Sequence, residues 1–210
     1  MTGFQEMPVL EFTEALASGA ATPGGGSASA LSGALAAGLV AMVARNTAAN
    51  PGFADRAAEL EEIVTEAEDL RRELVGLVDE DAAAFDRVMA AFRLPKDTEE
   101  LEAARSAEIQ ESYKAAVEPP LQVCRRALRI LALAEHVAEH GNPNAASDAG
   151  VAALLAASAL EGAALNVEIN LGSIKDESYR TSSAATAQRA RAEGATLRNR
   201  ALETVRARLS

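Results

Sequence analysis

The 210-residue chain contains no tryptophan, a single cysteine and only 3% aromatic residues. Few large rings are therefore available to anchor the deep core of a β-sandwich or barrel. Because Cys124 has no second cysteine to pair with, a disulfide scaffold is excluded and a reduced core thiol is expected. The N-terminal residues include acids and lack a continuous apolar run, so they do not resemble a signal peptide. These absences predict a cytoplasmic protein.

Alanine, in contrast, supplies 49 residues, close to half of the hydrophobic share of 49%. It is the best helix former, and small side chains let helices pack closely. Composition predicts an all-α fold, a multi-helical bundle with long amphipathic helices, in a single domain over residues 1–210. Residues 27–44 are uncharged and long enough for a membrane span, but we interpret them as a central buried helix. Along it a small residue recurs at every fourth position: Ser29, Gly33, Ala37 and Ala41.

Apolar residues recur at helical spacing along most of the chain, and glycine and proline mark the breaks. Asp97 and Glu100 resemble a capping box. Pro119 and Pro120 are expected to break or kink the chain. The expected helices cover residues 9–17, 27–50, 54–92, 98–118, 121–140, 147–174 and 182–209.

The formal net charge of −11 disfavours binding to the phosphates of nucleic acids. Residues 55–111 hold 18 acidic and 7 basic side chains, whereas residues 175–210 hold 4 acidic and 8 basic side chains. We interpret both runs as solvated helix faces, and the basic run is also suited to an anionic ligand or to the acidic face of a partner subunit.

Asp81 interrupts an apolar seam on the helix expected over residues 54–92. A carboxylate on this core-facing side is costly unless it is paired or functional, and burial raises its pKa toward acid–base use. The alternative is a kink near residues 79–81, where one acid caps a new helix start. The apolar members of the seam are Leu60, Ile63, Ala67, Leu70, Leu74, Leu77, Phe85, Val88 and Phe92.

A glycine loop precedes the small-residue helix. Gly24, Gly25, Gly26 and Ser27 follow Pro23, and such a loop at a helix start can present bare backbone N–H groups to an anion. A phosphate-binding P-loop requires a lysine after the glycines, and a dinucleotide-binding turn requires a strand before them. This loop has neither. The alternative is a plain connection with Ser27 as the N-cap.

Two further groups of polar residues are candidates for ligand binding. Asn142, Asn144 and Asp148 lie in or just after a loop, where caps and turns also explain them. Asn166 and Asn170 are four residues apart and share one face of an apolar helix. Side-chain amides both donate and accept hydrogen bonds, so the pair is suited to holding a planar heterocycle.

His136, Glu139 and His140 match the H-x-x-E-H pattern of some zinc hydrolases. The match lies at the end of a helix, and no downstream acidic ligand stands out. We therefore expect no metal site.

Together, four segments of this sequence resemble the cyclodeaminase/cyclohydrolase family. That family includes the C-terminal half of formiminotransferase-cyclodeaminase and stand-alone methenyltetrahydrofolate cyclohydrolases. The resemblance runs from about residue 9 to 176 and implies an all-helical, dimeric enzyme that acts on tetrahydrofolate without a metal or redox cofactor. The segments are PGGGS at 23–27, VDEDAAAFDRVMAAFRLPKDTEE at 78–100, GNPNAASDAGVAAL at 141–154 and ALNVEINL at 164–171.

The resemblance implies roles for the polar residues. Asp81 is expected to be the base, Lys96 to hold a carboxylate or orient water, and Asp148 to act in catalysis or pterin binding. The substrate is expected to contact Gly24, Gly25, Gly26, Ser27, Asn142, Asn144, Asn166 and Asn170.

The favoured function is formiminotetrahydrofolate cyclodeaminase, forming methenyltetrahydrofolate and ammonia. The alternatives are methenyltetrahydrofolate cyclohydrolase, to which the stand-alone length points, and a non-catalytic helical scaffold. We expect a cytoplasmic homodimer with no cofactor beyond the folate substrate, and with neither a nucleic-acid nor a membrane partner.

Overall fold

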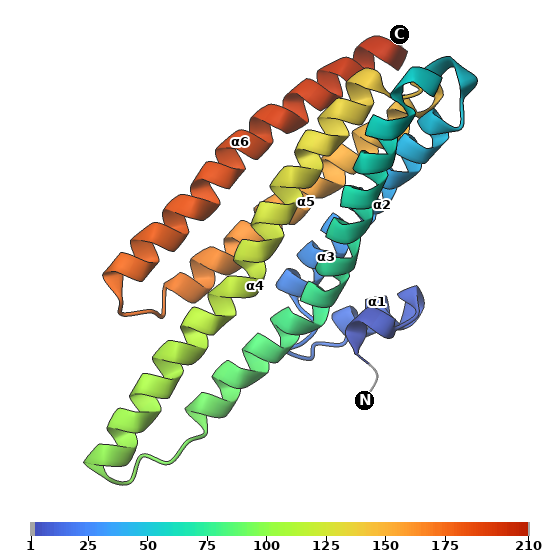
Figure 1. The fold of residues 1–210 in the computed structure, drawn as a ribbon. Helices are drawn as coiled ribbons and strands as arrows, with labels where there is room; N and C mark the ends of the chain where they lie inside the picture. The colour runs from blue at the N-terminus through green and yellow to red at the C-terminus, as the bar shows by residue number, and fades with distance from the viewer. Residues whose placement is uncertain (1–2, 210) are drawn as a thin grey trace.

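The computed structural model describes residues 3–209, which contain α-helices and short 3₁₀-helices and no β-strand. The all-α prediction is therefore confirmed for this part of the chain. Figure 1 shows the long helices running side by side as an elongated bundle. The α-helices are α1 (Val9–Ala17), α2 (Gly25–Ala48), α3 (Ala57–Phe92), α4 (Glu99–His140), α5 (Ala146–Leu171) and α6 (Glu177–Leu209).

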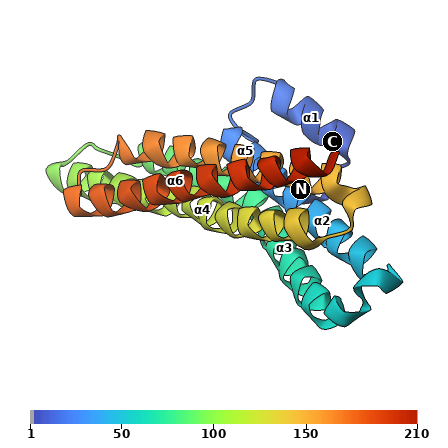
Figure 2. The same cartoon turned by 90° about the horizontal axis from the view of Figure 1, so that it is seen from above.

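Helix α2 is central and packs against α3, α4 and α5, whereas α6 covers α4 and α5 on the outside (Figures 1 and 2). The small-residue stripe of α2 is buried, as predicted, and it permits close helix contacts. A Cβ on Gly33 would lie 3.2 Å from Leu74 of α3 and 3.4 Å from Ala159 of α5. A Cβ on Gly162 would overlap Ser29, so the backbones of α2 and α5 approach closely here.

Helix α4 continues through Pro119 and Pro120, so the predicted break is wrong. Pro120 has no N–H to donate to the carbonyl of Ala116 four residues earlier. The side chain of Asn170 supplies the missing donor, because its Nδ2 donates to the Ala116 carbonyl oxygen over 2.9 Å. A residue on α5 thus repairs the hydrogen bonding of α4.

Two helix starts also differ from the prediction. Thr98, not Asp97, caps α4, and its hydroxyl accepts from the N–H of Leu101 over 3.2 Å. Helix α5 begins at Ala146, so Asp148 lies in its first turn, where a negative charge favours the positive end of the helix.

Helices α2 and α5 are long and apolar enough to cross a membrane by length and composition. In the bundle, however, 61% of the apolar window of α2 and 56% of that of α5 are buried by other helices. The prediction of a central buried helix over residues 27–44 is confirmed.

Cys124 is buried in the core, as predicted, with its Sγ 3.8 Å from the carbonyl oxygen of Leu160. Burial raises the pKa of the Cys124 thiol to about 12. The basic surface of α6 meets acidic neighbours, since Arg191 pairs with Glu161 and Glu168 of α5 at 2.7 and 2.9 Å.

Candidate functional site

A cavity of about 350 Å³ lies where the start of α2 meets α3, α4 and α5. This volume is within the range of small-molecule sites. Asp81 and the glycine loop, which are far apart in the sequence, lie together in its wall. The residues that line it are Ala21, Thr22, Gly24, Gly25, Gly26, Asp81, Phe85, Val88, Met89, Phe92, Tyr113, Ala116, Asn166, Ile169, Asn170 and Ser173.

Asp81 is half-buried on α3, which stays helical through this position, so no new helix starts at residues 79–81 and the capping alternative does not hold. The hydroxyl of fully buried Ser27 lies 2.9 Å from the carbonyl oxygen of Val78 and 3.2 Å from Asp81 Oδ2, and its one proton serves both acceptors. Burial raises the pKa of Asp81, and hydrogen bonds from Ser27 oppose that rise. The balance favours a carboxylate that accepts a proton more readily than an exposed one.

The glycine loop leads directly into the first turn of α2. Gly24 is the N-cap of this helix, so Ser27 is not its cap and instead directs its hydroxyl toward Asp81. Gly26 leaves room for that carboxylate, because a Cβ on it would overlap the oxygens of Asp81. Gly25 is exposed to the cavity, and a Cβ there would lie 3.5 Å from Asn166 Nδ2, an ordinary contact.

Asn166 and Asn170 both line the cavity, as their shared helix face predicted. Each uses its amide nitrogen within the protein. Asn166 Nδ2 donates to the carbonyl of Gly162 over 2.8 Å, and Asn170 Nδ2 donates to that of Ala116. These bonds fix the orientation of both amides at the cavity wall.

The opposite wall is apolar. Phe85 and Phe92, which the seam pattern placed in the core, are 39% and 42% exposed and face the cavity instead. Phe92 stacks edge-on against Tyr113 of α4, with ring centroids 6.2 Å apart. Tyr113 and Ile169 also line the cavity, although nothing in their sequence positions predicted it, and Ile169 is 74% exposed beside the two asparagines. A planar ligand placed here would meet aromatic rings and the Asp81 carboxylate, both carried by α3, and the amides carried by α5.

The polar loop residues lie elsewhere. Asn142 sits at the far end of α2, where its backbone N–H donates to Thr47 Oγ1 over 2.9 Å. Asp148 precedes Asn166 by 18 residues on α5, which corresponds to roughly 27 Å along the helix. Asn142, Asn144 and Asp148, which were expected to share one substrate site with Asp81, therefore lie far from it within one chain. The side chains of Asn144 and Asp148 make no hydrogen bond or ion pair with any other residue in 3–209.

Lys96 is exposed in the segment between α3 and α4 and does not line the cavity. This segment follows Phe92, the last residue of α3, whose ring is in the cavity wall.

The first histidine of the H-x-x-E-H match contacts charged residues of the protein itself. His136 Nε2 lies 2.7 Å from Glu59 Oε1 and 3.3 Å from Arg56. Residues 3–209 contain no group of three or more His, Cys, Asp or Glu side chains arranged to hold a metal ion.

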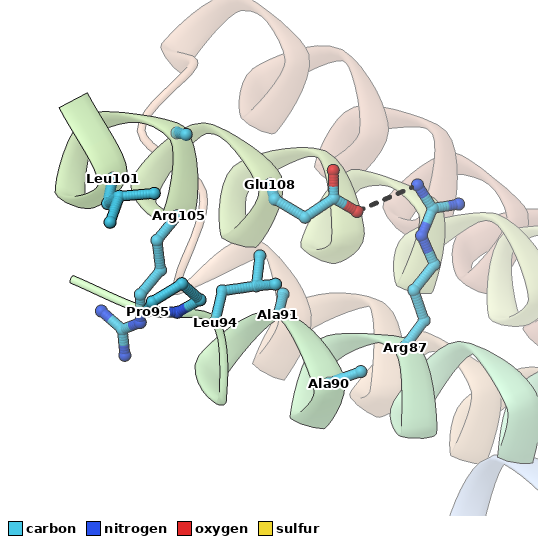
Figure 3. Close-up of a pocket in the computed structure, with 9 residues that line it drawn as sticks. Arg87, Ala90, Ala91, Leu94, Pro95, Leu101, Arg105 and Glu108 are labelled. Carbon is cyan, nitrogen blue, oxygen red and sulfur yellow. Dashed lines mark hydrogen bonds and ion pairs between the residues drawn. The ribbon is translucent and has the colours of Figure 1, made fainter.

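A second cavity, of about 540 Å³, lies between the end of α3 and the start of α4 (Figure 3). Its charged side chains are already engaged. Arg87 pairs with Glu108 at 3.4 Å, and Arg105 donates to the carbonyl oxygen of Phe92. It offers no free acid or base, so we assign the chemistry to the cavity around Asp81.

The chain is similar to several known proteins. The sequence model described as formiminotransferase-cyclodeaminase matches residues 8–189. Methenyltetrahydrofolate cyclohydrolase of Methylorubrum extorquens is 43% identical over 199 residues, covering 95% of this chain and 96% of that protein. Formimidoyltransferase-cyclodeaminase of Gallus gallus is 33% identical over 85% of this chain, which spans only 33% of the chicken protein.

A crystal structure of formiminotetrahydrofolate cyclodeaminase from Thermotoga maritima superposes with a TM-score of 0.89 at 30% identity. The alignment covers 98% of this chain and 99% of that structure. The resemblance inferred from the four sequence segments is thereby confirmed. This chain belongs to the formiminotransferase-cyclodeaminase family.

Proposed function

We propose that this chain is a one-carbon folate enzyme that hydrolyses methenyltetrahydrofolate to 10-formyltetrahydrofolate. The observation that carries the proposal is a half-buried carboxylate, Asp81, facing a cavity with one aromatic and one amide wall. The name and full-length match of the M. extorquens relative support the cyclohydrolase over the cyclodeaminase favoured by the sequence segments.

In this reaction Asp81 is the general base. It takes a proton from water as the oxygen adds to the methenyl carbon. The resulting tetrahedral carbon collapses as its bond to N5 breaks, and Asp81 returns the proton to N5. The remaining hydroxyl proton leaves to solvent as the formyl carbonyl forms. Asn166 and Asn170 face the heterocycle, and Phe85 and Phe92 stack against its rings.

The cyclodeaminase reaction is the second candidate, favoured by the name of the T. maritima structure, which aligns over almost the entire chain. There N10 of formiminotetrahydrofolate attacks the carbon of the protonated formimino group, whose nitrogen becomes an amine. Asp81 receives the N10 proton and passes it to this amine, which leaves as ammonia as the methenyl cation forms. Both reactions pass through a tetrahedral carbon and use the same base.

The experiment that tests the proposal follows the near-ultraviolet absorbance of methenyltetrahydrofolate. Decay to the formyl compound identifies the cyclohydrolase, whereas a rise from the formimino compound identifies the cyclodeaminase. Asp81→Asn keeps the shape of the side chain but cannot take the proton, so we expect kcat to fall by about 10²–10⁴-fold with folate binding retained. Wild-type turnover in this variant would remove Asp81 from the mechanism.

The proposal includes a homodimer, because α2 and α5 together present an uncharged apolar face to solvent. Its exposed members include Leu35 at 55%, Leu165 at 59% and Ile169 at 74%. Two helices about 40 Å long and about 10 Å apart offer roughly 800 Å² per subunit, the area of a standard interface. A monomer by light scattering at low micromolar concentration would contradict the dimer. We place this enzyme in the cytoplasm, with no cofactor beyond the folate.

A further inference from the structure

The exposed apolar residues of α5 are arranged symmetrically along the helix. Val151 and Ile169 each lie nine residues from Leu160, and Leu154 and Leu165 lie six and five residues from it. These four exposed residues fall on one helical stripe, opposite the buried side chain of Leu160. A stripe with this symmetry is self-complementary when two copies pair antiparallel, which is what a two-fold interface requires.

Antiparallel pairing has a consequence for the site. Asp148 lies twelve residues before Leu160, so the same pairing brings the partner's Asp148 opposite Gly172. Gly172 is flanked by Asn170 and Ser173, which line the cavity. Asp148 and Asn166 are 18 residues apart, a whole number of helical turns, and therefore project to the same flank of the stripe. When the two-fold axis is perpendicular to the paired helices, the flank that carries Asp148 and Asn166 faces the same side of the dimer in both subunits.

We propose that the partner subunit's 142–148 loop completes the cavity around Asp81. Each site then takes Asp81, the glycine loop and the two asparagines from one subunit and the partner's Asp148 from the other. This arrangement gives a role to the side chains of Asn144 and Asp148, which make no polar contact within residues 3–209. The ligand chemistry that fits an added carboxylate is the edge of a heterocycle that carries N–H donors.

The cavity is open on the side of α5 from which the partner subunit would approach. Gly25 of α2 packs beside Asn166, so α2 does not extend along α5 beyond that level. Ile169, at the edge of the cavity, belongs both to the cavity wall and to the exposed stripe. The cavity mouth is therefore continuous with the face that the second copy covers.

The geometry is tested by cross-linking without any substrate. In the double variant Asp148→Cys/Ser173→Cys, we expect an oxidised dimer on a non-reducing gel, because the two thiols meet across the interface. Within one chain, residues 148 and 173 are separated by most of the length of α5, far beyond the reach of a disulfide. Each single variant is the matched control and should give no linked dimer, since its two copies lie at opposite ends of the interface. A double variant that stays unlinked would overturn the proposed pairing.

The shared site is tested by mixing inactive subunits, a measurement that rests on the proposed role of Asp81. Asp148→Asn should lower kcat/KM by roughly 10- to 100-fold, mainly through KM, whereas Asp81→Asn lowers kcat. Co-refolding the two variants should recover about a quarter of the wild-type activity, because half the dimers are mixed and each mixed dimer has one intact site. If both acids served the same chain's site, mixing would restore nothing and the inference would fail. Full activity in Asp148→Asn alone would also overturn it, while leaving Asp81 and the proposed function in place.

Discussion

Gly26 and Asp81 are in such close contact that the carboxylate occupies the space a side chain at position 26 would need. The first turn of α2 and the middle of α3 are thereby held at a fixed separation, and the carboxylate is held against the N-terminal end of α2. Because the helix dipole and the free N–H groups of this turn favour negative charge, the contact also limits the rise in the pKa of Asp81.

Gly26→Ala should therefore displace the Asp81 carboxylate and lower kcat by about 10²-fold, the effect of misplacing a reacting group by about 1 Å. Gly76→Ala, also inside a helix, is the matched control, because a Cβ there has nothing within 4 Å. We expect it to retain activity and to stabilise the protein by about 0.5–1 kcal/mol. Steady-state kinetics and urea unfolding compare the two. Unchanged kcat in Gly26→Ala would show that the contact does not position the base.

Ser27→Ala should shift the pH dependence of the reaction. The variant loses the hydroxyl that stabilises ionised Asp81, while the burial that raises the pKa of Asp81 remains. The acid limb of the kcat/KM profile should therefore move to higher pH, with activity recovered once Asp81 is ionised. A profile that only scales down, with the limb in place, would mean that Ser27 does not act on the pKa of Asp81.

Asp81→Asn should be at least as stable as the wild type at neutral pH. The pKa of Asp81 is raised in the folded chain, so the folded state holds the proton more tightly than the unfolded state does. The stability that this group contributes is complete below its unfolded pKa and is lost as pH rises through its folded pKa. Asparagine undergoes no such loss, so the variant's advantage in the free energy of unfolding should grow with pH across that window. Urea unfolding over a pH series measures it, and a wild type that gains on the variant as pH rises would reverse the sign.

Asn170→Ala should destabilise the fold by about 1–3 kcal/mol, because it leaves the carbonyl of Ala116 without a donor. Pro120→Ala restores a backbone N–H to that carbonyl, so the same asparagine substitution should cost less in the Pro120→Ala background. A double-mutant cycle by urea unfolding measures this coupling directly. Additive effects of the two substitutions would show that the Asn170 bond does not compensate for the proline.

The sequence predicted the helices well because helical periodicity is a local signal. The seam of α3 and the small-residue stripe of α2 were both readable from spacing alone, and Asp81 was identifiable because it broke the seam. Continuity at Pro119 and Pro120 was not predictable in this way, since it depends on a donor from Asn170, about 50 residues away in the chain.

The candidate site was predicted only in part, for a related reason. Periodicity assigns Phe85 and Phe92 to the inner face of α3, but it does not indicate whether that face meets a neighbouring helix or a cavity. It also cannot show that α2 and α5 run antiparallel, which separates Asp148 from Asp81 within one chain. The sequence segments include several residues that line the cavity, but they do not give the distances that separate the others from it.

Figure 1 shows the end of α3 and the start of α4 projecting as a hairpin beyond the ends of α5 and α6. Phe92, which forms part of the aromatic wall, is the last residue of α3 in this two-helix extension, and its ring contacts Tyr113 of α4 at the base of the extension. With fewer neighbouring helices, its amides should exchange with solvent by subglobal opening at a lower free energy than those of the core around α2. A ligand that stacks on the two rings would therefore also stabilise the folded hairpin. The affinity of the site for its ligand and the local stability of the hairpin are thus linked quantities.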